Sequence, residues 1–356
     1  MTTELRIRTK IQEAELLEKV GKIVTDADYD VLLTRATRVL KPDGSLLCIY
    51  QPAAFDPELM ASFYDVLHSL RVYETDNRGL ASGTQRFIRP GRGRTRSAAM
   101  PVASTIIGNF DAKPPKQYCR LTAWTGRNWD EFASLFPLFR AIGQRFAEAV
   151  PDRYAVQMSQ VAQTPEEWVI EGTPFTTITV NNTYPTGVHT DKGDLAAGFS
   201  NVTVLRRGSY TGGLLTFPEY RVAADLHDGD LLLMDAHEWH GNTAIVKQDP
   251  TCWWCAEAAT HHVRMVPPDR HDARWGDYPA CASHTTQPPG PVLAVLPVVP
   301  AERISIVCYY RAKMKDCGTA EQEIARAQDW AEHRAGIMEQ SVVEEMAMEA
   351  AQVANG

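Results

Sequence analysis

The second half of the chain contains a series of short segments rich in β-branched residues, and this pattern restricts the possible fold more than any other feature. Gly, Asp and Asn residues that favour turns separate the segments. They are 176–184, 202–208, 212–220, 221–226, 230–236, 243–246 and 303–311. Short strands in this rhythm are typical of a sandwich or jelly roll and not of a βαβ sheet. We therefore expect a jelly-roll core over residues 151–318.

Helices are predicted on both sides of this core, so the expected fold class is α+β. Leu, Ile and Val recur there at three- and four-residue spacing. The segments with this pattern are 4–41, 57–73, 129–149 and 319–352, and a short apolar strand is predicted at 45–52. The expected organisation is a helical support region over 1–150, the core over 151–318 and a C-terminal helix over 319–356.

Residues 247–302 interrupt the predicted core strands. This segment is rich in Pro, His and Trp and lacks hydrophobic periodicity, so we interpret it as an irregular insertion. It contains a Cys-x-x-Cys pair and a Cys-x-x-His pair, which have the spacing of a structural zinc site. The four residues are Cys252, Cys255, Cys281 and His284. Metal binding would supply folding energy that a small core lacks, and packing of the tryptophans in the insertion is the alternative.

The composition is that of a globular protein and excludes a fibrous or wholly disordered chain. Of the 356 residues, 44% are hydrophobic and 22% are charged. The chain has neither an apolar run of about 20 residues nor the apolar segment of a secretory signal, so we expect no membrane association. Its seven cysteines are an odd number and widely spaced. We therefore expect reduced thiols and a cytoplasmic protein without a disulfide framework.

The charge is unevenly distributed along the chain. The net charge is −8, yet residues 77–129 contain ten bases and one acid. A polyanion responds to the local field and not to the sum, so this region could bind phosphates. Within it, the Arg- and Gly-rich segment 78–104 is predicted to be a loop that contacts a DNA backbone; an ordinary solvated loop is the alternative. The predicted contact residues are Arg89, Arg92, Arg94 and Arg96.

Three short motifs in the β-rich half have the residue types of an iron site. His189 and Asp191, two positions apart in an extended segment, point to the same side. A second histidine follows the apolar strand 230–236, and both His237 and His240 are candidates. Two histidines and one carboxylate suit non-haem Fe(II). The alternative for His189 and Asp191 is a surface turn without a metal.

A third motif, Arg303-Ile-Ser305, opens the last core strand. An arginine there could pair bidentately with the distal carboxylate of 2-oxoglutarate, and Arg311 and Arg264 are the alternatives. Asn181 and Asn182 lie just before the metal motif. One of them could hydrogen-bond the co-substrate or a base, although turn formation is the more ordinary role of Asn at a strand end.

These motifs resemble the oxygenase domain of the TET/JBP family. The resemblance spans about 175–315 and lies in VHTDKGDLAAGFSNVTVL, GLLTFPEYRVAADLHDGDLLLMDAHEWHGNT and RISIVCYYR. It suggests a bacteriophage-type member of the family, and the segment HTDKGD is closer to the thymine-oxidising branch. It implies a double-stranded β-helix that uses Fe(II), 2-oxoglutarate and O2. The implied metal ligands are His189, Asp191 and His240. Arg303 would bind 2-oxoglutarate, with Ser305 and Asn182 as neighbours in the cofactor site.

The resemblance also implies a reaction, the hydroxylation of the 5-methyl group of 5-methylcytosine or thymine in double-stranded DNA. The base would have to be flipped out of the duplex before hydrogen is abstracted from its methyl group. If a phage encodes the protein, it would act in the host cytoplasm. The alternatives are a hydroxylase of a protein side chain or small molecule, and a non-catalytic DNA-binding relative. A silent relative would be expected to lack a metal ligand, and this sequence has all three.

Overall fold

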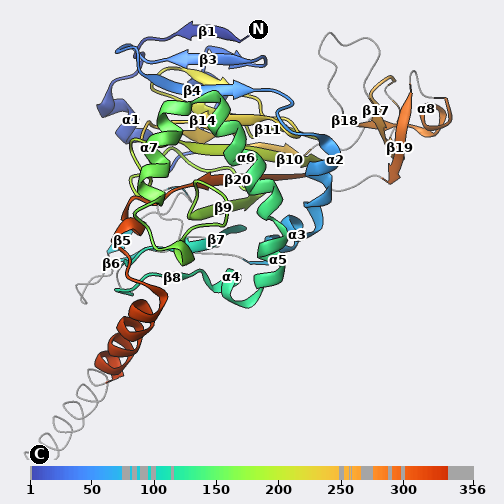
Figure 1. Ribbon diagram of the computed structural model, residues 1–356. Coiled ribbons are helices and arrows are strands. Elements are labelled where there is room, and N and C mark those ends of the chain that lie inside the picture. Colours follow the sequence, from blue (N-terminus) through green and yellow to red (C-terminus); the bar gives the residue numbers. More distant parts are fainter. Residues whose placement is uncertain are drawn as a thin grey trace, which may run out of the picture.

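A nine-stranded mixed sheet forms the centre of the computed structural model (Figure 1). The structure describes residues 2–73, 81, 86–88, 95–97, 102–113, 116–247, 252–255, 257, 259–265, 276–287, 291–297 and 301–335. In order across the sheet, the strands are β1 (Thr3–Arg6), β3 (Thr37–Leu40), β4 (Leu46–Gln51), β14 (Leu231–Met234), β10 (Ser200–Arg207), β20 (Glu302–Tyr309), β9 (Thr177–Asn182), β7 (Ser104–Phe110) and β8 (Arg120–Leu121). β1 pairs with β3 in parallel, and the other pairs are antiparallel.

A smaller sheet packs against one face of the large one, which gives the two layers of a jelly roll. Its strands, in order, are β15 (Gly241–Asn242), β12 (Leu215–Phe217), β13 (Val222–Ala224) and β2 (Val31–Leu33). A two-stranded ribbon of β11 (Tyr210–Gly212) and β16 (Ile245–Lys247) continues this layer. Buried side chains between the layers include Val202, Val204, Phe217, Val222 and Leu232. The strands predicted from residue 176 onward, and the α+β jelly-roll class, are confirmed.

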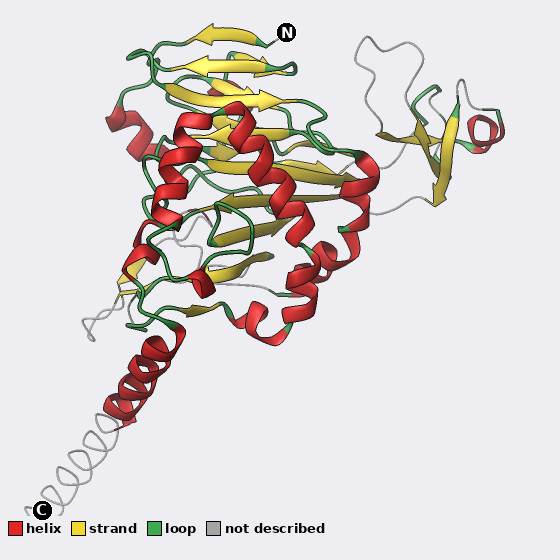
Figure 2. Cartoon of the chain, viewed as in Figure 1, coloured by secondary structure: helices red, strands yellow, loops and turns green. Residues whose placement is uncertain are grey.

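Helices cover the opposite face of the large sheet (Figures 1 and 2). They are α2 (Pro57–Ser62), α3 (Tyr64–Ser69), α4 (Ala123–Arg127), α5 (Trp129–Ser134), α6 (Phe136–Ala149) and α7 (Pro151–Val161). Their apolar stripes form one core with β9 and β20, in which Phe139 and Phe146 are completely buried against residues such as Ile178 and Ile306. Apolar residues repeat at helical spacing in 57–73 and 129–149, so the helices predicted there are confirmed.

The helix predicted over residues 4–41 is wrong. This segment contains only one α-helix, α1 (Glu13–Lys19), together with β1, β2 and β3. β1 and β3 lie at one end of the large sheet, and β2 pairs with the distant strand β13, so strand pairing overrides the local apolar spacing here. Strands on both sides of residue 150 are neighbours in the large sheet, as β7 and β9 are, so the predicted support region and the core share this sheet.

The insertion is more regular than predicted. It contains a three-stranded antiparallel sheet, in the order β18 (Gly276–Ala280), β17 (His261–Met265), β19 (Val292–Pro297), and one short helix, α8 (Ala282–Thr286). Figure 1 shows these elements as a small unit beside the main body. Among its described residues, the hydrophobic cluster of Val263, Met265, Tyr278 and Ala280 is too small to produce a clear hydrophobic period in the sequence.

The C-terminal helix is present over residues 320–335 of the described chain and extends away from the sheets (Figure 2). A disulfide between Cys119 and Cys317 joins the start of this region to the segment before β8, which corrects the expectation that all thiols are reduced. The remaining five cysteines are free. The carboxylate of Glu323 accepts a hydrogen bond from the backbone N–H of Cys119, which adds a second tie between the two segments.

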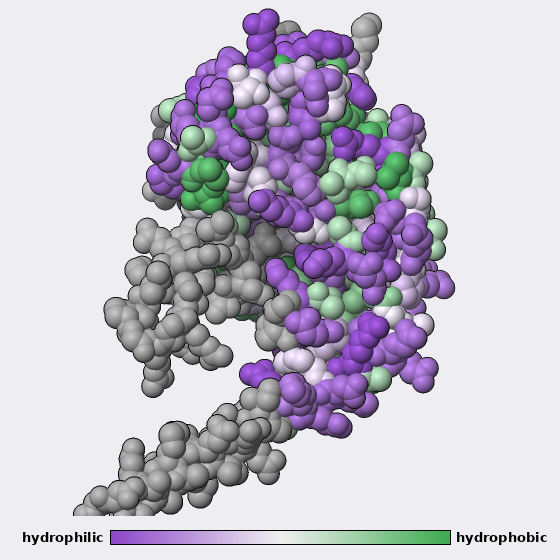
Figure 3. Space-filling model, turned by 90° about the vertical axis from the view of Figure 1, so that its left-hand side faces the viewer, coloured by the Kyte–Doolittle hydropathy of each residue, from purple (hydrophilic) through white to green (hydrophobic). Residues whose placement is uncertain are grey.

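Among the described residues, no helix is both long and apolar enough to cross a membrane. The face shown in Figure 3 is largely hydrophilic where the residues are described, with hydrophobic residues in small scattered groups. The short strands β5 (Arg86–Ile88) and β6 (Thr95–Ser97) pair as a hairpin in the Arg-rich segment. Of the predicted DNA-contact residues, Arg89, Arg92 and Arg94 lie outside the described residues, and so does the side chain of Arg96.

Candidate active site

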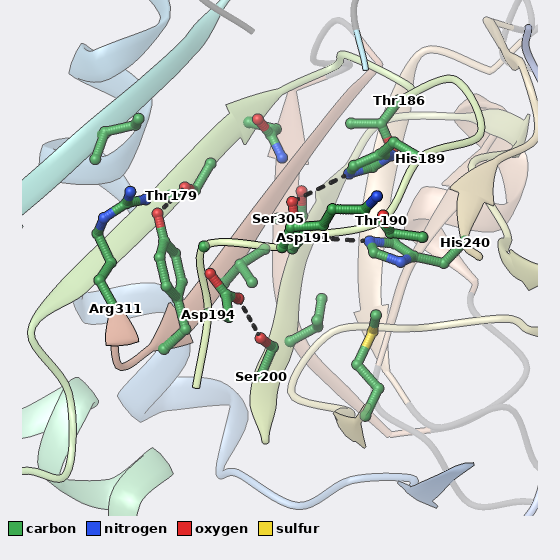
Figure 4. Close-up of a pocket in the computed structure, with 18 of the residues that line it drawn as sticks. Thr179, Thr186, His189, Thr190, Asp191, Asp194, Ser200, His240, Ser305 and Arg311 are labelled. Atoms are coloured by element: carbon green, nitrogen blue, oxygen red, sulfur yellow. Dashed lines mark hydrogen bonds and ion pairs between the residues drawn. The ribbon is translucent and has the colours of Figure 1, made fainter. Parts of the chain in front are cut away.

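His189, Asp191 and His240 lie around one point at the open end of the jelly roll (Figure 4). Their ligand atoms all lie within 4.8 Å of one another. One oxygen of Asp191 is 3.6 Å from Nε2 of His189, and the other is 3.5 Å from Nε2 of His240. Both histidines are buried, and Asp191 is partly exposed. The sequence separates the two histidines by 51 positions, so the fold and not the local chain assembles this cluster.

Backbone pairing fixes the positions of the three residues. The N–H of His189 donates to the carbonyl of His240 at 2.9 Å, and the N–H of His240 donates back at 3.0 Å. The N–H of Asp191 donates to the carbonyl of Ala236, also at 2.9 Å. The segment after β9 is thus attached directly to the turn after β14, which places the imidazoles and the carboxylate on the same side.

Both imidazoles are oriented for metal binding. Nδ1 of His189 lies 2.8 Å from the carbonyl oxygen of Gly187, and Nδ1 of His240 lies 2.9 Å from that of Glu238. A carbonyl can only accept, so each Nδ1 must carry the hydrogen. In the neutral ring, Nε2 then has the lone pair, and Nε2 is the atom that faces Asp191 in both cases. Histidine ligands of metals ordinarily have such a backbone or carboxylate partner.

A buried ionic network supports the turn that carries His240. Nζ of Lys41, directly after β3, lies 2.7 Å from Glu238 and 3.1 Å from Asp235. The hydroxyl of Tyr220 donates to the other oxygen of Glu238. Burial lowers the pKa of Lys41, but its hydrogen bonds to Glu238 and Asp235 and their charges outweigh this effect and raise it. Lys41 therefore stays cationic and holds both carboxylates of the turn.

Arg303 lies in the same pocket, whose volume is about 610 Å³. Its side chain is 4% exposed, and its Nη2 has no hydrogen-bond partner among the described residues. Burial lowers the pKa of this guanidinium, which nevertheless remains charged at neutral pH. Gly213 leaves room for it, because a Cβ there would lie 2.9 Å from Cδ of Arg303. A buried cation with an unused donor fits a carboxylate ligand.

The alternatives that the sequence left open differ in their surroundings. Arg311 lines the pocket, but its Nε donates to Asp111 and its guanidinium packs on Phe110. Arg264 is on β17 in the insertion and does not line this pocket. Nδ1 of His237 is 3.9 Å from Asp235, and His237 is not part of the ligand cluster. The structure therefore brings Arg303, and not the other two arginines, to the ligand cluster as a buried cation with an unused donor.

Strand alternation separates the remaining predicted cofactor residues. Arg303 and Ser305 are both on the pocket side of β20, and Asn181, which pairs with Ser305, is on the same side of β9. Asn182 points the other way, and its amide lies 3.5 Å from the carbonyl of Leu67. Asn182 therefore does not line the pocket and Asn181 does. The period-two rule would have separated the two residues if the register with β20 had been known.

Basic residues that the sequence analysis had not assigned to the site also line this pocket. Lys113 and Lys116 lie between β7 and β8, and Lys192 follows Asp191 directly; all three are exposed. Arg120 also lines the pocket, and its guanidinium lies over the ring of Phe110. Lys113, Lys116 and Arg120 belong to the basic region 77–129, so part of that region lies at the pocket, although these were not the residues predicted to contact DNA.

The comparisons with known proteins agree with this geometry. Residues 107–262 match the family model Tet_JBP, described as the oxygenase domain of the 2OGFeDO superfamily. This segment of the chain is similar to the oxygenase domain of the TET/JBP family. The match includes all three ligands of the cluster and ends before Arg303. The superfamily is one of Fe(II)- and 2-oxoglutarate-dependent oxygenases, and the chemistry of the donor set fits both: two imidazoles with a carboxylate for iron, and a buried, unpaired arginine for the carboxylate.

Curated relatives within the TET/JBP family are much longer than the matched segment. Thymine dioxygenase JBP1 of Trypanosoma brucei brucei is 34% identical over 153 residues, which are 42% of this chain and 18% of that protein. The bifunctional helicase and thymine dioxygenase JBP2 of Trypanosoma brucei brucei (strain 927/4 GUTat10.1) is 30% identical over 231 residues, 64% of this chain and 20% of that protein. The structure of NgTET1 in complex with 5mC DNA superposes with a TM-score of 0.50 at 11% identity, covering 90% of this chain and 100% of that one, and indicates a shared fold.

Proposed function

We propose that the protein is an Fe(II)- and 2-oxoglutarate-dependent dioxygenase that hydroxylates the 5-methyl group of a pyrimidine in DNA. One observation carries the proposal: the cluster of His189, Asp191 and His240 shares a pocket with a buried guanidinium that has an unused donor. Neither half of this arrangement alone would specify a 2-oxoglutarate oxygenase. The cluster lies in the segments that follow β9 and β14, and the guanidinium is on β20.

In this mechanism, the residues of the chain bind and orient the reactants. Nε2 of each histidine and the Asp191 carboxylate would hold the iron, and Arg303 would pair with the distal carboxylate of 2-oxoglutarate, with Ser305 and Asn181 beside it. Bound iron and 2-oxoglutarate would supply the oxidising chemistry with O2, while the protein fixes positions and limits access of water. The burial of both histidines and of Arg303 provides such a sheltered site.

The charges around the pocket support DNA as the substrate. Lys113, Lys116 and Lys192 are exposed and line the pocket that contains the ligand cluster, although the whole chain has a net charge of −8. Phosphates near a flipped base would meet these cations. A methyl group inside a duplex cannot reach a buried metal, so the base must leave the stack at a cost of a few kcal/mol, which phosphate contacts would help to offset.

Thymine and 5-methylcytosine present the same C5 methyl group. The JBP relatives are named as thymine dioxygenases, whereas NgTET1 was solved with 5mC DNA. We propose thymine as the first substrate to test, because the thymine dioxygenases are the relatives with sequence identity of 30% or more. We also propose that the protein acts in the cytoplasm.

The test is a nucleoside mass analysis. Purified protein, Fe(II), ascorbate and 2-oxoglutarate are incubated with a duplex that contains thymine and 5-methylcytosine, and the DNA is digested to nucleosides. We expect a nucleoside one oxygen atom heavier, formed only when 2-oxoglutarate is present. If succinate forms without an oxidised nucleoside, the protein is a dioxygenase that acts on a substrate other than DNA. If iron-loaded protein forms no succinate, the proposed dioxygenase activity is wrong.

A matched pair of variants ties the result to the site. His240→Ala removes a metal ligand, and we expect it to abolish succinate formation. His237→Ala changes a histidine three positions away that is outside the cluster, and we expect activity within a few-fold of wild type. Equal loss in both variants would contradict the assignment of His240.

A further inference from the structure

Four side chains of the insertion converge far from the active site. They come from a turn before β17 and from the start of α8 and are Cys252, Cys255, Cys281 and His284. Their ligand atoms all lie within 4.8 Å of one another. None of the described residues between 252 and 297 lines the pocket of the ligand cluster, so this second group is separate from the proposed chemistry.

The spacing of these atoms is that of a tetrahedral zinc site. With Zn–S bonds of about 2.3 Å and a Zn–N bond of about 2.0–2.1 Å, neighbouring ligand atoms lie roughly 3.5–3.8 Å apart. Nδ1 of His284 is 3.4, 3.7 and 3.3 Å from the sulfurs of Cys252, Cys255 and Cys281. The sulfurs of Cys255 and Cys281 are 3.7 Å apart, well beyond the roughly 2.05 Å of a disulfide.

The four side chains offer the ligand atoms that zinc prefers in structural sites, which are thiolate sulfur and imidazole nitrogen. Cys252 and Cys281 are buried and the other two are partly buried, so the group is sheltered from solvent.

The unit that carries the cluster has little else to stabilise it. Its hydrophobic core consists of Val263, Met265, Tyr278 and Ala280, with Trp254 and Val292 packed against them. Leu293 and Val295 on β19 are largely exposed. Units of this size rarely fold on hydrophobic burial alone and usually need disulfides or a metal, and the cysteines here form no disulfide.

We infer that the insertion binds one structural zinc ion through Cys252, Cys255, Cys281 and His284. Four protein ligands close the coordination sphere, so the ion has no open position for substrate, unlike a catalytic zinc site. Its role is to join the turn before β17 to α8 and so to hold the three-stranded sheet together. The inference does not depend on the proposed function.

The test counts zinc in variants that separate the two metal sites. Zinc is measured by mass spectrometry in the full-length His240→Ala protein, in which the first cluster lacks a ligand. We expect about one zinc per chain, and its loss when His284→Ala is added. His284→Cys, which restores a fourth ligand, should retain the ion, and His261→Ala, an exposed histidine on β17, is the matched control.

Two further measurements keep the outcome decisive. Cobalt added to zinc-free protein should give thiolate-to-cobalt charge-transfer bands, which two imidazoles and a carboxylate cannot produce. Limited proteolysis should cut within 252–297 in His284→Ala but not in wild type, while the main body survives because its core shares no residue with the insertion. Zinc-free wild type with freely reactive thiols, or a Cys255–Cys281 disulfide, would overturn the inference.

Discussion

At the scale of single residues, Arg303 is the most informative position in the pocket. It is almost fully buried, and its Nη2 has no partner among the described residues. A buried guanidinium with an unused donor lowers the stability of the fold, and a bound carboxylate would offset this cost. The site is therefore better explained by a bound anion than by stability alone.

We predict that Arg303→Lys weakens 2-oxoglutarate binding about 10- to 100-fold, because lysine keeps the charge but loses the bidentate fork, and a charged hydrogen bond contributes about 1.5–3 kcal/mol. The measurement is the KM for 2-oxoglutarate from succinate formation. Arg206→Lys is the control, since Arg206 is the β10 partner of Arg303 but pairs with Asp225 outside the pocket. An unchanged KM in Arg303→Lys would move the carboxylate site elsewhere.

Residue types and order in the sequence left His237 and His240 as alternatives, and the family resemblance selected His240; the side of a strand that a residue faces could not be predicted. Asn181 and Asn182 differ only in which side of β9 they occupy, and that depends on the register with β20, which is set 120 residues later. The sequence alone could not have distinguished them.

At the scale of elements, the turn between β3 and β4 supports the turn that carries His240. Lys41 contacts both Asp235 and Glu238, and all three side chains are at least four-fifths buried. The sequence did not reveal this link because residues 4–41 were predicted to be helical. Pairing with distant strands, and not local propensity, determines the structure there.

We predict that Lys41→Met weakens iron binding about 10- to 100-fold, because the carboxylates that orient the His240 turn lose their shared cation. It should also lower the free energy of unfolding by about 3 kcal/mol or more, since two buried charges become unpaired. Iron affinity is measured by titration of the metal-free protein. Lys41→Arg should recover most of the affinity, and Lys10→Met, an exposed ion pair with Asp30, should leave it unchanged.

A second ionic link joins β10 to the turn between β13 and β14. Asp225 contacts Arg206 at 3.2 Å and His227 at 3.0 Å. Burial raises the pKa of Asp225, but the hydrogen bond and charge of His227 and the charge of Arg206 outweigh it and lower the pKa to about 2. An unfolded Asp has a pKa of about 3.9, so the folded state holds this proton more weakly.

We predict that Asp225→Asn lowers the free energy of unfolding by about 2 kcal/mol near pH 7. Because the folded pKa is the lower one, the contribution of Asp225 is complete above the unfolded pKa and is lost as the pH falls through about 2. The difference between wild type and variant should therefore shrink below about pH 4. Urea unfolding at several pH values measures it. Asp65→Asn, at an exposed residue that forms no ion pair within the described chain, should show no such trend.

At the scale of the whole molecule, the net charge of −8 coexists with exposed lysines around the pocket. The β7–β8 end carries Lys113 and Lys116, which line the pocket together with Lys192. The β1–β3 end is farthest from them in strand order. Total charge would have argued against DNA, whereas the basic region 77–129 includes two of the lysines that line the pocket. The location of the charged residues is therefore more informative about a DNA partner than the net charge.

We predict that replacing Lys113, Lys116 and Lys192 by Gln reduces the salt dependence of DNA binding. Each phosphate contact contributes about 0.9 to the slope of log affinity against log salt, so the slope should fall by about 0.9 for each lysine that contacts a phosphate. Affinity for a short duplex is measured by fluorescence anisotropy over a range of salt concentrations.

The matched control removes equal charge from the other end of the sheet, at Arg8, Lys10 and Arg35, which are exposed and do not line the pocket. If the slope reports the local field around the pocket, only the pocket variant should change it. Succinate formation without DNA should persist in both variants, because none of the six residues belongs to the ligand cluster. An equal change in both slopes would mean that DNA responds to total charge, and the binding surface would then have to be sought elsewhere on the molecule.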